Sequence, residues 1–153
     1  MGAARKTVVQ PAGQPVTKVD VGRESPMERA RTLAREAYVS GQGADPDQAV
    51  EVLEHSLSLL LPVGASEALA DVLRWKGSIL RDRGNHSSAA DLYAQSLAVA
   101  DSVGYKRGRA HVLNCLGTVA QIRGDLVESE RWFGEAARLA HRLGDRSLSG
   151  MVQ

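Results

Sequence analysis

One pair of side chains has the types and spacing for nucleophilic chemistry. His111 and Cys115 lie four residues apart, so they would share one face of a helix. In such a pair the imidazole removes the thiol proton, but a third group must orient the histidine and donors must stabilise an oxyanion. Nothing in the sequence around the pair supplies these groups. We therefore interpret Cys115 as a small semi-buried thiol beside a histidine, and we expect no catalytic residues and no enzyme.

Other residue types that bind ligands are also scattered. The remaining histidines, His55, His86 and His141, lack the spacing of metal ligands. The chain has no phosphate-binding loop or dinucleotide fingerprint, and Gly41-Gln42-Gly43 is typical of a turn. Trp75 and Trp132 could stack on bases, but no basic run accompanies them. We expect no metal, no cofactor and no nucleic-acid partner.

Composition indicates a helical, soluble domain. At 153 residues the chain fits one domain, and its low aromatic content of 4% beside abundant Ala and Leu favours helices over sheets. The net charge of +1 gives no overall attraction to nucleic acid or membrane. The single cysteine suits a reducing compartment. Because the sequence has neither a signal-peptide core nor an apolar run of membrane-spanning length, we expect a cytoplasmic protein without a membrane partner.

Helix start and stop signals recur along the chain. Ser25-Pro26-Met27-Glu28 is a capping box with proline in the first turn, and Asp45 and Asp125 are further cap residues. Glycines at 64, 84, 104, 124 and 144 are placed to end helices. These signals predict helices near 26–40, 46–61, 67–83, 86–103, 106–123 and 126–143, with a stub from 146. Residues 1–24 have no helical period and predict a flexible arm.

The helices repeat with a period of 40 residues. Aligned columns are Leu33/Leu73/Leu113, Ala37/Gly77/Gly117, Val39/Ile79/Val119, Ala49/Ala89/Ser129, Leu53/Tyr93/Phe133, Ser56/Ser96/Ala136 and Leu60/Ala100/Ala140. So many columns in register, without a gap, indicate three repeats over 25–64, 65–104 and 105–144. Each unit is a helical hairpin that must stack on its neighbours to bury its apolar face. We expect the small residue at Gly77 and Gly117 to allow close helix approach, and the bulky column to fill the space between hairpins.

These columns resemble the tetratricopeptide repeat over about residues 26–146. The matching residues are Lys76-Gly77, Gly84-Asn85, Ala89 and Tyr93 in the second unit, and Leu116-Gly117, Gly124-Asp125, Phe133 and Ala136 in the third. The 40-residue length is similar to the long repeats of bacterial signalling proteins. The resemblance implies an all-α, right-handed α-solenoid of three hairpins with a C-terminal helix stub, acting as a protein-interaction scaffold.

In this family the first helix of each hairpin lines a concave groove that holds a peptide or a partner helix. The resemblance therefore predicts a ligand-binding groove formed by Arg31, Arg35, Tyr38, Arg74, Trp75, Ser78, Arg81, His111, Asn114, Thr118 and Gln121. The clamp by which some members grip a terminal carboxylate is absent, because Ala34, Tyr38, Trp75, His111 and Cys115 stand at the matching places. The alternative function is a structural module that self-assembles through its open ends.

Charge gives the one indication of the ligand. The first helices, counted over 26–40, 67–83 and 106–123, carry +6 in total, whereas the second helices with their caps carry −7. If the first helices line the groove, an acidic protein or peptide is the expected partner.

The C-terminal end predicts an incomplete stack. Asp145 is a candidate cap, and Leu148, Met151 and Val152 repeat the apolar start of a first helix. We expect residues 145–153 to begin a fourth repeat or form a capping helix. The chain would then be part of a longer protein, or a homo-oligomer that pairs through this end.

Overall fold

The computed structural model describes residues 24–42 and 45–151, which form helices joined by short turns. The elements are α1 (Pro26–Gly41), α2 (Pro46–Leu60), the short 3-10 helix η1 (Leu61–Val63), α3 (Glu67–Asp82), α4 (His86–Ser102), α5 (Lys106–Ile122), α6 (Leu126–Leu143) and α7 (Arg146–Met151). The predicted all-α class is confirmed, and the predicted helix bounds agree to within one residue. Apart from Glu24, the predicted arm lies outside the described residues.

Side-chain caps begin most of the helices. Ser25 accepts a hydrogen bond from the Glu28 amide, and the Glu28 carboxylate accepts one from the Ser25 amide, which completes the predicted capping box. Asp45 and Asp125 cap α2 and α6 in the predicted way. Tyr105 stands at the same place before α5 but makes no capping hydrogen bond. Tyr105 instead takes part in the candidate binding face.

The helices end at glycines spaced twenty residues apart. Gly84, Gly104, Gly124 and Gly144 all have positive φ, as the sequence predicts. The amide of the residue after each glycine donates to a carbonyl five residues earlier, for example Asn85 to Leu80 at 2.8 Å. The same turn is thus used at four helix ends, and it reverses the chain each time.

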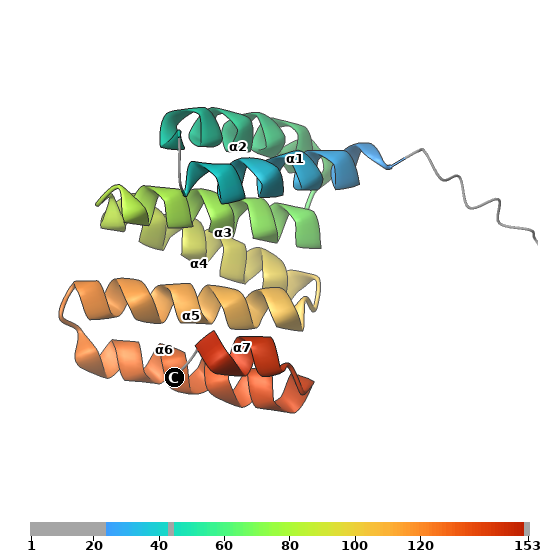
Figure 1. Ribbon diagram of the computed structural model, residues 1–153. Helices are drawn as coiled ribbons and strands as arrows, with labels where there is room; N and C mark the ends of the chain where they lie inside the picture. The colour runs from blue at the N-terminus through green and yellow to red at the C-terminus, as the bar shows by residue number, and fades with distance from the viewer. Residues whose placement is uncertain (1–23, 43–44, 152–153) are drawn as a thin grey trace, which may run out of the picture.

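Neighbouring helices pack as pairs: α1 with α2, α3 with α4 and α5 with α6 (Figure 1). Each later odd-numbered helix also contacts the pair before it, so α3 packs on α1 and α2, and α5 packs on α3 and α4. The short α7 packs on α5 and α6. Because α1 contacts α3 and α3 contacts α5, these three helices form one continuous surface, which we call the odd-helix face.

The glycine and bulky columns meet inside the helix pairs. A Cβ atom on Gly77 would lie 2.8 Å from a ring carbon of Tyr93, and one on Gly117 would lie 2.7 Å from Phe133. Tyr93 is fully buried because Val112, Cys115 and Val119 of α5 cover it. Phe133, in the last pair, is only half-buried. The expectation that the bulky column fills the space between pairs therefore applies to Tyr93 but not to Phe133.

Candidate binding face

A hollow of about 630 Å³ opens on the odd-helix face between α1, α3 and α5. We call it the odd-helix hollow; its lining residues are Glu24, Glu28, Arg31, Thr32, Arg35, Trp75, Tyr105, Arg107 and His111. Four of them, Arg31, Arg35, Trp75 and His111, are predicted groove residues that come together from three helices.

A buried carboxylate anchors the polar side chains of this hollow. Asp71 of α3 is 3% exposed and forms ion pairs with Arg31 of α1 and, at 3.4 Å, with Arg74. The Tyr105 hydroxyl lies 3.3 Å from the same carboxylate and also accepts a hydrogen bond from Arg31. A buried charge of this kind requires partners, and Arg31, Arg74 and the Tyr105 hydroxyl supply them.

An aromatic stack forms one wall beside this cluster. The rings of Tyr38 and Trp75 are nearly parallel, with centroids 6.0 Å apart, and join α1 to α3. The guanidinium of Arg74 lies over the Trp75 ring at 5.6 Å. Trp75 is thus held in place, and it lines the hollow although only 7% of its surface is exposed.

His111 of α5 is the neutral member of the site. Burial, followed by repulsion from Arg74, lowers the pKa of His111 to about 4, although Asp71 and Asp145 oppose this shift. The imidazole is therefore uncharged at neutral pH. In that state its two ring nitrogens offer one donor and one acceptor for a ligand.

Several predicted groove residues lie elsewhere. Ser78 is buried, and its hydroxyl is hydrogen-bonded to the Tyr93 hydroxyl at 3.0 Å, so this position faces α4 and not a groove. Arg81 is held by two hydrogen bonds to the adjacent Asp82. Thr118 donates to the backbone carbonyl of Asn114 at 3.0 Å. Asn114 and Gln121 also lie outside the lining of the hollow, Asn114 half-buried and Gln121 exposed.

The charge count also overstates the positive charge of this face. Lys76 reaches Glu54 of α2 at 3.1 Å, and Arg83 reaches Asp47 of α2 at 2.7 Å. Arg109 bridges Asp101 of α4 and Glu135 of α6. These first-helix cations bind the acidic second helices, because residues on one helix point in several directions. The positive charge of the hollow comes from Arg31, Arg35 and Arg107.

Two important residues were missed by the sequence prediction. Tyr105 and Arg107 line the hollow from the start of α5. The signal for Tyr105 is its N-cap position. The other N-cap residues all cap their helices by a side-chain hydrogen bond, whereas Tyr105 cannot; they are Ser25, Asp45, Ser66, Asn85 and Asp125. The Tyr105 ring packs so closely over Gly108 that a Cβ there would clash, which explains the glycine within α5.

The possible Cys–His pair is separated by the fold. Cys115 is buried in a cluster with Tyr93, Val112 and Val119, whereas His111 lines the hollow. Over the described residues no group of His, Cys, Asp and Glu side chains is arranged to hold a metal ion. None of the helices in this same part of the chain is long and apolar enough to cross a bilayer.

No protein-family model matches this chain, and no curated protein is significantly similar to it.

Proposed function

We propose that this chain is a tetratricopeptide-type right-handed solenoid that holds an acidic segment of a partner protein on its odd-helix face. The 40-residue columns, the helix pairs and the glycine turns at twenty-residue spacing support this proposal. In such a stack the first helices lie on the inner side, which makes the odd-helix face the groove.

The observation that carries the proposal is the grouping of Arg31, Arg35 and Arg107 in one hollow, together with Trp75 and Tyr105. Guanidinium groups pair with carboxylates through two parallel hydrogen bonds, so they favour Asp and Glu side chains over neutral ligands. Arg35 is exposed, and the Arg107 side chain is 61% exposed although it contacts Asp145. Both can therefore turn to a ligand, whereas Arg31 is held by Asp71.

We expect the partner to be a protein or peptide in the cytoplasm. We expect the chain itself to be the docking or sensory part of a bacterial signalling protein. The hollow combines charged side chains with the rings of Trp75 and Tyr105, so a peptide segment could make both ion pairs and ring contacts there. Glu24 and Glu28 also line the hollow and would repel nearby carboxylates of an acidic segment.

The experiment that tests this proposal is capture of cellular proteins by the immobilised chain, followed by quantitative comparison of two double variants. Arg35→Glu with Arg107→Glu should lose the specific partner, because it reverses two charges in the hollow. Arg138→Glu with Arg142→Glu changes the same charge at exposed positions of α6 and should retain it. A partner that both variants retain equally would contradict the proposed site.

A second candidate function, self-assembly through the ends of the stack, is favoured by a separate observation. Ile122, Leu126 and Val127 near the α5–α6 turn are 50%, 62% and 81% exposed. Their counterparts forty residues earlier are the polar residues Asp82, His86 and Ser87. Light scattering on the purified chain discriminates the two functions: a concentration-dependent increase in mass, abolished by Leu126→Ser with Val127→Ser, would favour self-assembly.

A further inference from the structure

The first helix pair exposes an apolar residue that the later pairs bury. Leu33 is 44% exposed, whereas Leu73 and Leu113 at the equivalent positions are 4% and 0% exposed. The reason is packing: Leu73 belongs to the apolar cluster that joins α3 to α1 and α2. Leu33 occupies the same place on α1, but no helix among the described residues covers it.

A second column shows the same difference further along α1. Val39 is 64% exposed, whereas its counterparts Ile79 and Val119 are each 2% exposed. In two independent columns the apolar residue is thus buried in the later pairs but exposed in the first pair, where no helix among the described residues covers it. Large exposed apolar residues grouped on one face commonly mark a docking site.

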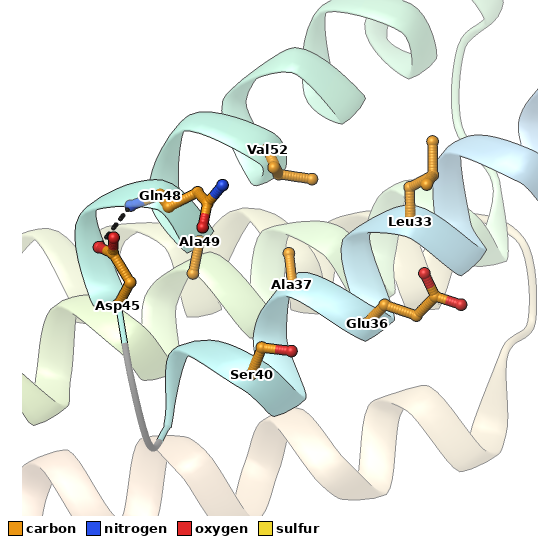
Figure 2. Close-up of a pocket in the computed structure, with 8 residues that line it drawn as sticks. All are labelled: Leu33, Glu36, Ala37, Ser40, Asp45, Gln48, Ala49 and Val52. Atoms are coloured by element: carbon orange, nitrogen blue, oxygen red, sulfur yellow. Dashed lines mark hydrogen bonds between the residues drawn. The ribbon is translucent and has the colours of Figure 1, made fainter.

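Leu33 borders a cleft between α1 and α2, which we call the first-pair cleft (Figure 2). Leu33 and Ala37 of α1 face Ala49 and Val52 of α2 across it. The cleft has a volume of about 280 Å³, and a second hollow of about 340 Å³ that includes Val39 adjoins it along α1. Together they form a recess on the end of the stack that lies beyond α1 and α2.

The interior of the molecule shows what kind of element covers such a recess. Between the first and second pairs, Leu53, Leu57 and Leu60 of α2 pack in the same cluster as Leu73. Between the second and third pairs, Leu97 of α4 packs in the cluster of Leu113. In both places, leucine side chains from a helix of the preceding pair pack against the equivalent leucine. A helix with an apolar stripe is therefore the element that fits the first-pair cleft.

Charge distinguishes this end from the internal interfaces. Where the second pair has Lys76, which reaches Glu54 of the covering helix α2, the first pair has Glu36 at the cleft. Asp45, the cap of α2, adds a second carboxylate to the cleft. A covering helix that carries an acid like Glu54 would be repelled here, and one that carries a Lys or Arg at that place would be attracted.

From this combination we propose that the first-pair cleft docks an amphipathic helix of another protein, with an apolar stripe on Leu33 and Val39 and a basic side chain on Glu36. A second copy of this chain fits less well. The position on α6 equivalent to Glu54 is Gly134, and α7 already packs on α5 and α6, where the α1 of a following copy would have to begin. The Val39 hollow shares Thr32 and Arg35 with the odd-helix hollow, so the two sites adjoin, whereas no residue of the first-pair cleft lines the odd-helix hollow.

The test uses α2 itself as a template for the probe. Two synthetic peptides of residues 45–63, constrained as helices, differ only by Glu54→Lys and are titrated into the full chain with fluorescence anisotropy as the readout. We expect the Glu54→Lys peptide to bind about three- to tenfold more tightly, because a like-charge contact becomes an ion pair. The Glu36→Lys variant of the chain should reverse this preference. Equal binding of both peptides, or no binding of either, would overturn the proposal.

Matched variants place the binding site on the recess. Leu33→Ser with Val39→Ser removes two exposed apolar side chains and should abolish binding, while the fold stays intact by circular dichroism. Val63→Ser with Val103→Ser makes the same kind of change at exposed positions outside the recess and should leave binding unchanged. Retained binding in the first variant would contradict the assigned site.

Two other occupants give different results, and either would replace the proposal. A dimer in analytical ultracentrifugation that Leu33→Ser with Val39→Ser dissociates would make a second copy the occupant. Peptide binding that requires deletion of residues 1–23 would make the N-terminal segment of this chain the occupant. A monomer that binds the Glu54→Lys peptide with those residues present supports docking of a foreign helix.

Discussion

Arg31 and Asp71 lie forty residues apart in the chain, and their side chains form an ion pair between α1 and α3. They occupy equivalent positions in successive units, and His111 on α5 is the third member of the same column. One column of the repeat thus supplies a cation, an anion and a neutral imidazole to adjacent places on the odd-helix face. The repeat positions these side chains, and the differences between units give the hollow its chemistry.

Asp71→Asn tests the buried anion. The substitution keeps the shape but leaves Arg31 and Arg74 without their counter-charge, and the Arg74 side chain is only 13% exposed. We expect a loss of about 3 kcal/mol in the free energy of unfolding, measured by urea denaturation. Asp82→Asn is the matched control, because Asp82 pairs with Arg81 but is 46% exposed, and it should cost less than about 1 kcal/mol. Similar small losses for both variants would contradict the role of Asp71 as an anchor.

Glycine-to-alanine changes should have opposite signs at two helical positions. Gly77→Ala places a Cβ 2.8 Å from the Tyr93 ring, so we expect a loss of about 1–3 kcal/mol from overpacking. Gly134→Ala meets nothing closer than the end of Arg138 at 3.6 Å. It should stabilise the protein by about 0.5–1 kcal/mol, because alanine is the better helix former. Thermal melts of the two variants check this, and a stabilising Gly77→Ala would refute the close packing.

Alanine substitutions in the bulky column should lower the free energy of unfolding by unequal amounts. Tyr93→Ala should cost about 3–5 kcal/mol, because the ring is completely buried between α3 and α5. Phe133→Ala, at the half-buried equivalent position, should cost clearly less. Denaturant melts of both variants under the same conditions measure the difference. If Phe133→Ala costs as much as Tyr93→Ala, the last pair must be covered as fully as the second.

Acid should destabilise the protein partly through His111. Its pKa is lowered to about 4 in the folded state, chiefly by burial, whereas an unfolded histidine titrates near 6.5. Between these values the unfolded chain binds the proton more readily, so the free energy of unfolding should fall as the pH decreases from about 6.5 to 4. The His111→Gln variant should show a shallower dependence, measured by denaturant melts across this range. His141→Gln, at an exposed position of α6, should follow the parent; a parallel course for His111→Gln would be inconsistent with the buried imidazole.

Much of the fold was predictable because its signals are local. Ser25, Asp45 and Asp125 mark helix starts, and glycines at twenty-residue spacing mark helix ends. Each signal depends on a few neighbouring residues whose backbone groups must be satisfied whatever the rest of the chain does. The order of the helices follows from these signals, and the 40-residue columns then identify which faces are apolar.

The binding face was predictable only in part, because it depends on which neighbour each side chain meets. The family resemblance placed Ser78 and Arg35 in one groove, yet Tyr93 binds the Ser78 hydroxyl inside the core while Arg35 is exposed at the hollow. Charge counting included Arg109 in the total of the first helices, although two acids of the second helices hold it. Tyr105 was missed: its place at an N-cap is unusual in the sequence, but only the structure shows that its hydroxyl reaches Asp71.

The most direct test of the central claim is a nuclear magnetic resonance titration of the isotope-labelled chain with a glutamate-rich peptide and, as control, a lysine-rich peptide of the same length. We predict that the acidic peptide shifts the backbone amides and the Trp75 indole around the odd-helix hollow. These shifts should weaken with added salt and disappear in Arg35→Glu with Arg107→Glu, but persist in Arg138→Glu with Arg142→Glu. Shifts confined to α2, α4 and α6, or equal responses to the acidic and basic peptides, would contradict an acid-binding groove on this face.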